Sequence, residues 1–215
     1  QNQGRLIAEA NPNPVSRTAT VTVTSSDLTR TVTVTQPPVY YSIGSVALGA
    51  RALEDQAMYV VFFGGSTQGT GTTDLEGDMA RTSLTDKSQK VTANYVFKFH
   101  KTQSFTNNWM TDGQSYNNAS SGYLQSMYNG KYQSANVASS MLDFIADDKA
   151  SATELIFAGW WQGDAEYGAD LDIWDYATRS SGKKTMYWTG SYLNYSTNTG
   201  VYPRKWFFYK VEEVQ

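Results

Sequence analysis

The sequence predicts an all-β protein, and two patterns carry that prediction. Short runs of alternating or continuous apolar residues follow one another, separated by turns rich in Gly, Pro, Asn and Asp. In contrast, the segment 139–146 alone has apolar residues at helical spacing. Many strands with at most one or two short helices are typical of a β-sandwich or a jelly-roll-like domain.

An abrupt change of composition near residue 39 predicts two parts. All 15 Tyr, 6 Trp and 9 Phe lie at or after Tyr40. The first part ends in Gln36-Pro37-Pro38, and a proline pair resists both helix and central strand, so it indicates a stiff connector. We therefore expect a β module with its linker in residues 1–38 and an aromatic-rich β-domain in residues 39–215.

Two strands are predicted in the first part. Residues 18–24 alternate Thr with Ala or Val, which places the apolar residues on one face of a strand. Residues 28–35 repeat the pattern, and the polar residues 25–27 between them predict a hairpin. Residues 5–10 are expected to supply a third strand, which the Asn-Pro-Asn-Pro sequence at 11–14 ends.

These strands are too few to form a domain alone. Chains below roughly 40 residues seldom fold without disulfides or metals, and this part has no cysteine and no aromatic residue. We expect an upstream half of the module to lie outside the given sequence. Packing of the strands on the second domain, or on another chain, is the alternative.

The first part resembles a known family. Residues 10–24, ANPNPVSRTATVTVT, and residues 28–36, LTRTVTVTQ, are similar to the C-terminal half of a BACON-type (Bacteroidetes-associated carbohydrate-binding) immunoglobulin-like domain. The resemblance covers about residues 5–37 only. It implies the end of an immunoglobulin-like sandwich in an extracellular, cell-surface or virion setting. In many members the module serves as a spacer, so the resemblance is weak evidence for sugar binding.

Strands dominate the prediction for the second part. Residues 58–63 form a continuous apolar run bounded by Gly64-Gly65, which is typical of a strand buried on both faces. Residues 91–99 place alternate apolar residues on one face of a further strand. The remaining strong candidates are 154–161, 186–188 and 206–209.

Two local features of the second part are more specific. Asn129-Gly130 predicts a two-residue hairpin turn that pairs Tyr128 with Lys131. Residues 139–146 are predicted as a short helix, because Met141, Leu142 and Ile145 fall on one side of it.

Composition excludes several classes of protein and favours others. The charges nearly balance, with 17 basic and 20 acidic residues, so there is no electrostatic case for nucleic acid or an anionic membrane. No apolar run approaches the 18 residues of a membrane span. Without cysteine, disulfides and thiol catalysis are excluded. The low charged fraction of 17%, with abundant Thr, Ser, Asn, Tyr and Gly, favours an extracellular, cell-surface or virion location.

An acidic cluster is the sharpest candidate for ion binding. It consists of Asp164, Glu166, Asp170, Asp172 and Asp175. Oxygen ligands gathered on one loop suit Ca²⁺, although the spacing lacks the EF-hand pattern. Alternation of the aspartates with Leu171 and Ile173 favours a solvent-facing strand, and a bound Ca²⁺ is the alternative.

Three further features favour structure over chemistry. His100 is the only histidine and is predicted to lie on the polar surface of its strand, so a multi-histidine metal site within one chain is excluded. The glycine-rich residues 64–71 lack the Gly-Lys-Ser/Thr ending of a phosphate loop. Twenty acidic residues make some pair at glycosidase spacing inevitable, so no pair is informative.

The aromatic residues are the remaining candidates for binding. Adjacent Trp160 and Trp161 point to opposite faces of a strand, so a loop, partner or ligand must cover one of them. An ordinary aromatic core is the plain alternative to a binding surface of stacking side chains. The candidate ligand-binding residues are Trp161, Trp174, Tyr176, Trp188, Tyr192 and Tyr195.

These observations lead to three expected functions. The first is a non-catalytic binding or adhesion protein that contacts glycans without a cofactor. The second is a structural component, such as a phage capsid-decoration, fibre or tail protein, which assembles with neighbouring subunits or copies of itself. A secreted glycan-active hydrolase is third.

Overall fold

The computed structural model describes most of the chain. The backbone is described for residues 5–11, 13–63, 68–72, 79–81, 84, 86, 88–105, 108–110, 114–116, 119–136, 141–159, 171–176, 185–189, 192–196 and 206–214. The side chains are described for residues 5–11, 13–62, 69–72, 84, 86, 88–105, 119–135, 143–158, 173, 176 and 206–214.

Strands make up nearly all of the described secondary structure. The first ten strands are β1 (Arg17–Ser25), β2 (Leu28–Gln36), β3 (Tyr40–Val46), β4 (Met58–Phe63), β5 (Gln68–Thr72), β6 (Met79–Arg81), β7 (Lys90–Thr92), β8 (Val96–Phe105), β9 (Asn108–Met110) and β10 (Gln114–Tyr116). The others are β11 (Ala119–Ser126), β12 (Tyr132–Asn136), β13 (Met141–Ala146), β14 (Leu155–Gly159), β15 (Leu171–Asp175), β16 (Thr185–Thr189), β17 (Tyr192–Ser196) and β18 (Trp206–Val214). Two single-turn 3₁₀ helices, η1 (Ala50–Ala52) and η2 (Ala93–Tyr95), complete the described elements.

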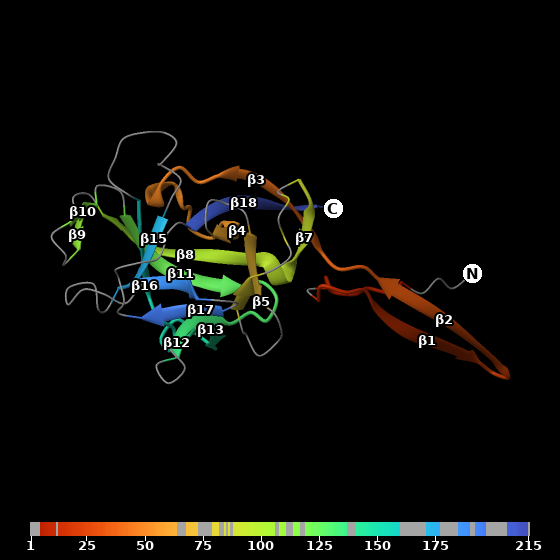
Figure 1. Ribbon diagram of the computed structural model, residues 1–215. Helices are drawn as coiled ribbons and strands as arrows, with labels where there is room; N and C mark the ends of the chain where they lie inside the picture. Colours follow the sequence, from red (N-terminus) through yellow and green to blue (C-terminus); the bar gives the residue numbers. More distant parts are fainter. Residues whose placement is uncertain are drawn as a thin grey trace.

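The prediction of an all-β fold is confirmed. One antiparallel sheet of 14 strands contains every described strand except the pairs β1–β2 and β9–β10. The sheet bends strongly around a common centre (Figure 1). Opposite parts of the sheet therefore face each other across an apolar core, as the layers of a sandwich do.

The sheet closes on itself through the pairing of β4 with β18. Starting from β4, the pairs β4–β8, β8–β11, β11–β14, β14–β15, β15–β18 and β18–β4 form an unbroken ring of six strands. Closure gives each of the six strands a partner on both sides, although β15 and β18 share only the pair Leu171–Trp206.

Alternate residues of these strands fill the ring. Tyr59 and Val61 of β4 belong to the cluster inside the ring, whereas Val60 and Phe62 belong to a second cluster on the other face. All four side chains are at most 1% exposed, so the prediction that β4 is buried on both faces is confirmed. The inner cluster contains Ala47, Ala50, Leu53, Tyr59, Val61, Phe97, Phe99, Leu124, Phe144, Leu155, Phe157, Ile173, Trp206 and Phe208.

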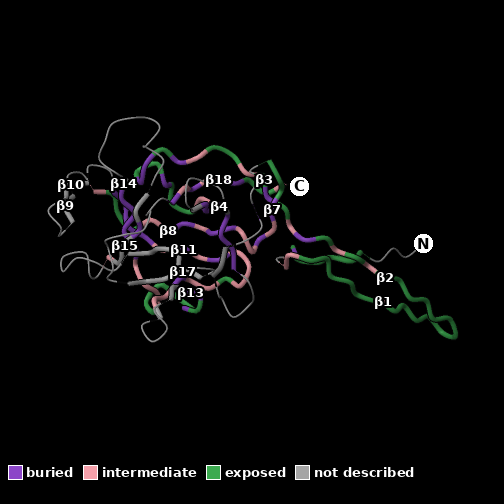
Figure 2. Tube along the Cα trace, in the orientation of Figure 1, coloured by how far each residue is buried: buried purple, intermediate pink, exposed green. Residues whose placement is uncertain are grey.

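The predicted N-terminal hairpin is also present. Strands β1 and β2 pair over their whole length, with Val21 opposite Val32, and Ser26 in the turn has a φ of 50°. The hairpin projects from the large sheet and is exposed along its length (Figures 1 and 2). The linker is fixed where the hairpin begins, since the Val39 N–H donates to the Asn11 carbonyl at 3.1 Å.

The predicted third strand of this part is wrong. Residues 5–10 have no regular secondary structure and are exposed. The Glu9 carbonyl oxygen accepts hydrogen bonds from Arg17 Nη2 and Gln36 Nε2, which are side chains of the hairpin. These bonds take the place of pairing with a neighbouring strand.

The predicted helix at 139–146 is likewise wrong where the structure describes it. Residues 141–146 form β13, which pairs with β12. Phe144 is fully buried, whereas Ile145, which the predicted helix would turn toward the core, is 46% exposed. So short a helix would be marginal alone, whereas pairing with β12 satisfies the backbone.

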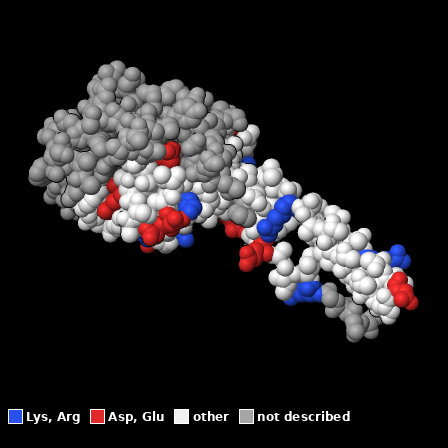
Figure 3. Space-filling model, turned by 90° about the horizontal axis from the view of Figure 1, so that it is seen from below, with Lys and Arg blue, Asp and Glu red and all other residues white. Residues whose placement is uncertain are grey.

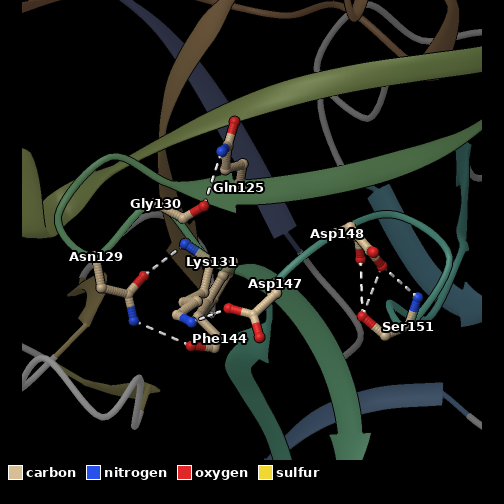
Figure 4. Close-up of polar contacts among 8 residues, drawn as sticks. All are labelled: Gln125, Asn129, Gly130, Lys131, Phe144, Asp147, Asp148 and Ser151. Carbon is tan, nitrogen blue, oxygen red and sulfur yellow. Dashed lines mark hydrogen bonds and ion pairs between the residues drawn. The ribbon is translucent and has the colours of Figure 1, made fainter.

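The turn at Asn129-Gly130 is longer than predicted. The last pair before it is Gln125 with Tyr132, so Tyr128 does not pair with Lys131. Gly130 has a φ of 73°, whereas Asn129 is not among the positive-φ residues, and the predicted turn requires both. The Asn129 side chain instead accepts the Lys131 N–H and donates to the Phe144 carbonyl (Figure 4).

The strand expected at 91–99 is divided in two. The helix η2 separates β7 from β8. As a result Val91 and Val96 pack in the outer cluster, while Phe97 and Phe99 pack inside the ring. A single alternating face was therefore the wrong expectation.

A bulge interrupts the pairing of β8 with β11. Ser121 stands opposite Gln103 and Gly122 opposite Lys101, which leaves Thr102 without a partner residue. At Gly122 the two strands approach closely, and an added Cβ would lie 2.3 Å from the His100 carbonyl oxygen and 2.7 Å from the Phe99 ring. The bulge therefore requires glycine at this position.

We expect Gly122→Ala to lower the free energy of unfolding by about 3 kcal/mol, the upper end of the range for overpacked cores. The matched variant is Gly130→Ala, where φ is +73° but no atom lies within 4 Å of the added Cβ. That variant is expected to lose only about 1 kcal/mol, from backbone strain. Urea denaturation of the full chain compares the two, and equal losses would contradict the close approach at Gly122.

Candidate functional site

The structure brings most of the predicted aromatic residues onto neighbouring strands. Trp174 lies in β15, Trp188 in β16, and Tyr192 and Tyr195 in β17, while Tyr176 directly follows β15. Strand β16 pairs with both β15 and β17. Trp161, and the side chains of the four residues within strands, lie outside the described residues. Tyr176 is therefore the one predicted binding residue whose side chain the structure describes.

Tyr176 packs against the end of β8. Its ring stacks on the ring of Phe105 with a centroid separation of 6.1 Å and an interplanar angle of 30°. Its hydroxyl oxygen accepts a hydrogen bond from Gln103 Nε2 at 2.7 Å. Both rings are half-buried and Gln103 is exposed, so part of this contact faces solvent.

Hydrogen bonds to the main chain fix both partners of the stack. The Tyr176 N–H donates to the Glu154 carbonyl at 2.9 Å and extends the β14–β15 ladder by one residue. The Phe105 carbonyl accepts from Arg51 Nε and Nη2, at 3.1 and 2.8 Å. The stacked rings are therefore held on rigid elements rather than on a long loop.

A carboxylate and two hydroxyls form a second polar cluster, with Thr102 on β8, Ser121 on β11 and Glu154 directly before β14. Glu154 Oε1 accepts from Thr102 Oγ1 at 2.5 Å and from Ser121 Oγ at 2.7 Å. The two hydroxyl oxygens are 2.6 Å apart, and because each carries one proton, at most two of the three contacts are hydrogen bonds at once. Burial raises the pKa of the nearby Tyr123, and the charge of Glu154 raises it by a smaller amount.

The bulge between β8 and β11 supplies this cluster. Thr102 is the residue that the bulge leaves unpaired, and its hydroxyl reaches both Ser121 on β11 and Glu154 beside β14. Bulges commonly re-aim a side chain next to a functional site. We call the six residues Thr102, Gln103, Phe105, Ser121, Glu154 and Tyr176 the Tyr176 surface.

Sequence reasoning found only one member of the Tyr176 surface. The polar run from Lys101 to Ser104, directly after an apolar strand, was a signal that the strand leaves the core there. Glu154 was assigned only as the start of a strand. Its proximity to Thr102 arises from strands that are 52 residues apart in the sequence, which no local pattern shows.

The acidic cluster is only partly described. Asp172 and Asp175 lie in β15, opposite Ala158 and Leu155, and Ile173 between them is fully buried. This agrees with the predicted alternation of a strand. Asp164, Glu166 and Asp170 lie outside the described residues, so Ca²⁺ binding stays a prediction. Among the side chains that are described, no group of three or more His, Asp or Glu is placed to hold a metal ion.

The prediction that His100 lies on the surface is wrong. Its side chain is only 7% exposed and packs beside Tyr132, with ring centroids 5.2 Å apart. The two ring nitrogens contact amide groups, with Nε2 2.8 Å from Gln125 Oε1 and Nδ1 3.2 Å from Gln56 Nε2. His100 and Phe99 point to opposite faces of β8 as the alternation predicts, but Tyr132, Gln125 and Gln56 pack over the face that carries His100.

These amides favour a neutral His100. Gln125 Nε2 donates to the Gly130 carbonyl, which directs Oε1 to the histidine as an acceptor (Figure 4 shows the Gln125–Gly130 bond). Gln56 Nε2 faces Nδ1 as a donor, so the imidazole carries its proton on Nε2. Burial is the main cause that lowers the pKa of His100 from 6.5. Lys149 and Lys98 lower this pKa further, whereas Gln125 and Asp55 raise it by less than burial lowers it.

We expect the protein to lose stability as the pH falls through about 6.5, because the unfolded chain then binds a proton that folded His100 resists. The loss should continue down to the lowered folded-state pKa of His100 and reach at most about 1.4 kcal/mol per pH unit. Urea denaturation between pH 8 and pH 5 measures this slope. His100→Gln should remove the loss in this window, and an unchanged slope in that variant would contradict the assignment.

No protein-family model, curated protein or solved structure matches this chain.

Proposed function

We propose that the chain is a non-catalytic binding protein of a cell surface, virion or extracellular space, and that it contacts glycans through the Tyr176 surface. The observation that carries this proposal is the half-buried Tyr176–Phe105 stack, with the Gln103 amide at the tyrosine hydroxyl. A tyrosine has an apolar face and a polar tip, which suits the apolar face and the hydroxyls of a sugar ring.

The neighbouring polar groups support the same ligand class. Glu154 Oε1 is engaged by two hydroxyls, and among the described residues no partner is found for Oε2, which remains available as an acceptor. The Gln103 amide adds both a donor and an acceptor. A few polar groups placed around an apolar contact are typical of small-ligand sites.

Charge gives no support for an ionic ligand. The net charge is −3 over the whole chain. Basic and acidic side chains are interspersed over the part of the face that Figure 3 draws in colour. Among the described residues, no helix has the length and hydrophobicity to cross a bilayer. A neutral ligand, bound by stacking and hydrogen bonds, therefore fits this surface better than nucleic acid does.

A second candidate function is assembly through the N-terminal hairpin. One face of the hairpin carries Val21, Val23, Leu28 and Val32, and Val23, Leu28 and Val32 are 59%, 58% and 56% exposed. The opposite face is made of threonines paired across the strands. Within the described residues β1 and β2 pair only with each other, so both outer edges can accept a further strand.

For glycan binding, we expect Tyr176→Ala to weaken the affinity about tenfold, because it removes the stacking ring. Tyr176→Phe keeps the ring and loses only the Gln103 contact, so it should weaken binding less. Tyr40→Ala removes a tyrosine on β3 that is 40% exposed and should leave binding unchanged. A glycan array identifies the best ligand, and calorimetry then compares its affinity for the wild type and the three variants. Absence of any bound glycan, or wild-type affinity of Tyr176→Ala, would sink the proposal.

For assembly, we expect the full chain to self-associate and the double variant Val23→Thr, Val32→Thr to weaken that association at least about tenfold. The matched control is Thr22→Ser, Thr31→Ser on the other face, which should associate like the wild type. Sedimentation velocity over a range of concentrations measures the effect. A wild-type chain that stays monomeric throughout would exclude self-assembly through this face.

A further inference from the structure

A small pocket shares no lining residue with the Tyr176 surface. It has a volume of about 270 Å³ and opens between β3, β18 and the segment that contains η1. Its lining residues are Ser45, Val46, Ala47, Leu48, Ala52, Glu54, Tyr59 and Lys210. The volume falls just below the roughly 300–1,000 Å³ of most small-molecule sites, so the ligand must be small.

A second bulge shapes the pocket. Tyr209 stands opposite Val46 and Val211 opposite Ile43, so Gly44 and Ser45 together face the single residue Lys210. A Cβ on Gly44 would lie 3.0 Å from the Lys210 carbonyl oxygen, so glycine lets the strands approach there. The bulge turns the chain next to Lys210 and lets Ser45 and Lys210 line the same pocket.

An ion pair forms the polar side of the pocket. Lys210 Nζ lies 2.8 Å from Glu54 Oε2, and this contact raises the pKa of Lys210. Among the described residues, neither Glu54 Oε1 nor the remaining ammonium protons of Lys210 have a further partner. The pair therefore offers an acceptor and donors side by side, with no net charge.

Tyr59 adds a donor at the base of the pocket. Its side chain is 1% exposed, and its hydroxyl oxygen accepts the Glu54 N–H at 2.9 Å. Burial raises the pKa of Tyr59, so the phenol keeps its proton. Within the described part of the chain no acceptor receives that proton. A buried donor without an acceptor is costly unless a ligand or water accepts from it.

The ligand class follows from these groups. The Lys210–Glu54 pair carries no net charge and its side chains are 43% and 62% exposed, so the pocket holds no desolvated charge that would favour an ionic ligand. A neutral ligand with adjacent hydroxyls can donate to Glu54 and accept from Lys210 and Tyr59 without breaking the pair. Ala47, Leu48 and Ala52 supply an apolar wall, and Leu48 is 62% exposed although it is large and apolar.

We propose that this pocket binds a single neutral sugar ring through its vicinal hydroxyls. The choice of a sugar over other neutral diols rests on the proposed glycan binding of the Tyr176 surface. The geometry of the pocket itself is independent of that surface, so the two proposals can fail separately.

The experiment is an NMR titration of the full chain, in which the methyl groups of Ala and Leu are labelled with ¹³C. The added ligands are neutral methyl hexopyranosides of the gluco, galacto and manno series. Saturable shifts of the Leu48 and Ala47 methyl resonances are expected for at least one of them. Glucosamine and glucuronate, which carry a positive and a negative charge on the same ring, should bind no more tightly than the neutral glycosides. Absence of a saturable shift with every neutral glycoside would overturn the proposal.

Variants locate the binding. Lys210→Met and Glu54→Gln should each weaken the best glycoside about tenfold, because each removes a charged hydrogen-bonding partner. Tyr59→Phe should weaken it several-fold, with the melting temperature measured to show that the variant is folded. The matched controls Lys90→Met and Glu213→Gln alter exposed charges on β7 and β18 and should leave the titration unchanged. Wild-type affinity in both Lys210→Met and Glu54→Gln would refute the proposal.

Tyr176→Ala separates the two sites. It should leave the Leu48 titration unchanged, since Tyr176 does not line the pocket. If the glycan array fails while Leu48 still responds, the Tyr176 proposal falls and the pocket stands. If oligosaccharides bind and depend on Tyr176 while Leu48 does not respond, the pocket proposal falls alone.

Discussion

Pairing between β4 and β18 is the constraint on which the rest of the fold depends. It joins strands that begin at residues 58 and 206 and turns an open sheet into a ring. The aromatic side chains inside make this closure favourable. Phe208 meets the rings of Tyr59 and Phe157 edge to face, at centroid distances of 5.9 and 5.5 Å. Each such pair contributes about 0.5–1.5 kcal/mol beyond the burial of area, and each buried ring contributes about 1.5–3 kcal/mol.

Both candidate sites arise where the strands of this ring lose regular register. An extra residue in β8 directs Thr102 toward Glu154, and an extra residue in β3 lets Ser45 line a pocket with Lys210. A glycine permits the close approach in each case, Gly122 beside β8 and Gly44 beside β18. Regular strands would alternate their side chains between core and solvent. The irregular residues are those that can present polar groups at the rim without placing them in the core.

The most apolar strands and the N-terminal hairpin were predictable from the sequence, whereas many short strands and most strand partners were not. The continuous apolar run at residues 58–63 predicted a strand buried on both faces, and the Thr/Val pattern of residues 17–36 predicted the hairpin. Period alone misassigned residues 141–146, where pairing with β12 outweighs a helical spacing that three apolar residues suggested. His100 was misplaced for a related reason, because the residues that cover its face of β8, Gln56, Gln125 and Tyr132, lie 25 to 44 residues away in the sequence. Tyr176 could be named from composition, but Gln103, Phe105 and Glu154 could not, since only the folded sheet brings them together.

The two parts of the chain differ in how their apolar residues are used. In the ring, β4 buries both faces because strands and loops cover each side. In the hairpin, the threonine face can hydrogen-bond with water, but Val23 and Val32 each leave more than half of their surface in solvent. A two-stranded sheet is marginal by itself, and covering a valine contributes about 1.5–3 kcal/mol. Any surface that covers this face therefore stabilises the hairpin and gains affinity from the same contacts. That coupling makes assembly through the hairpin a physical alternative to glycan binding, because it depends on residues that the Tyr176 surface does not use.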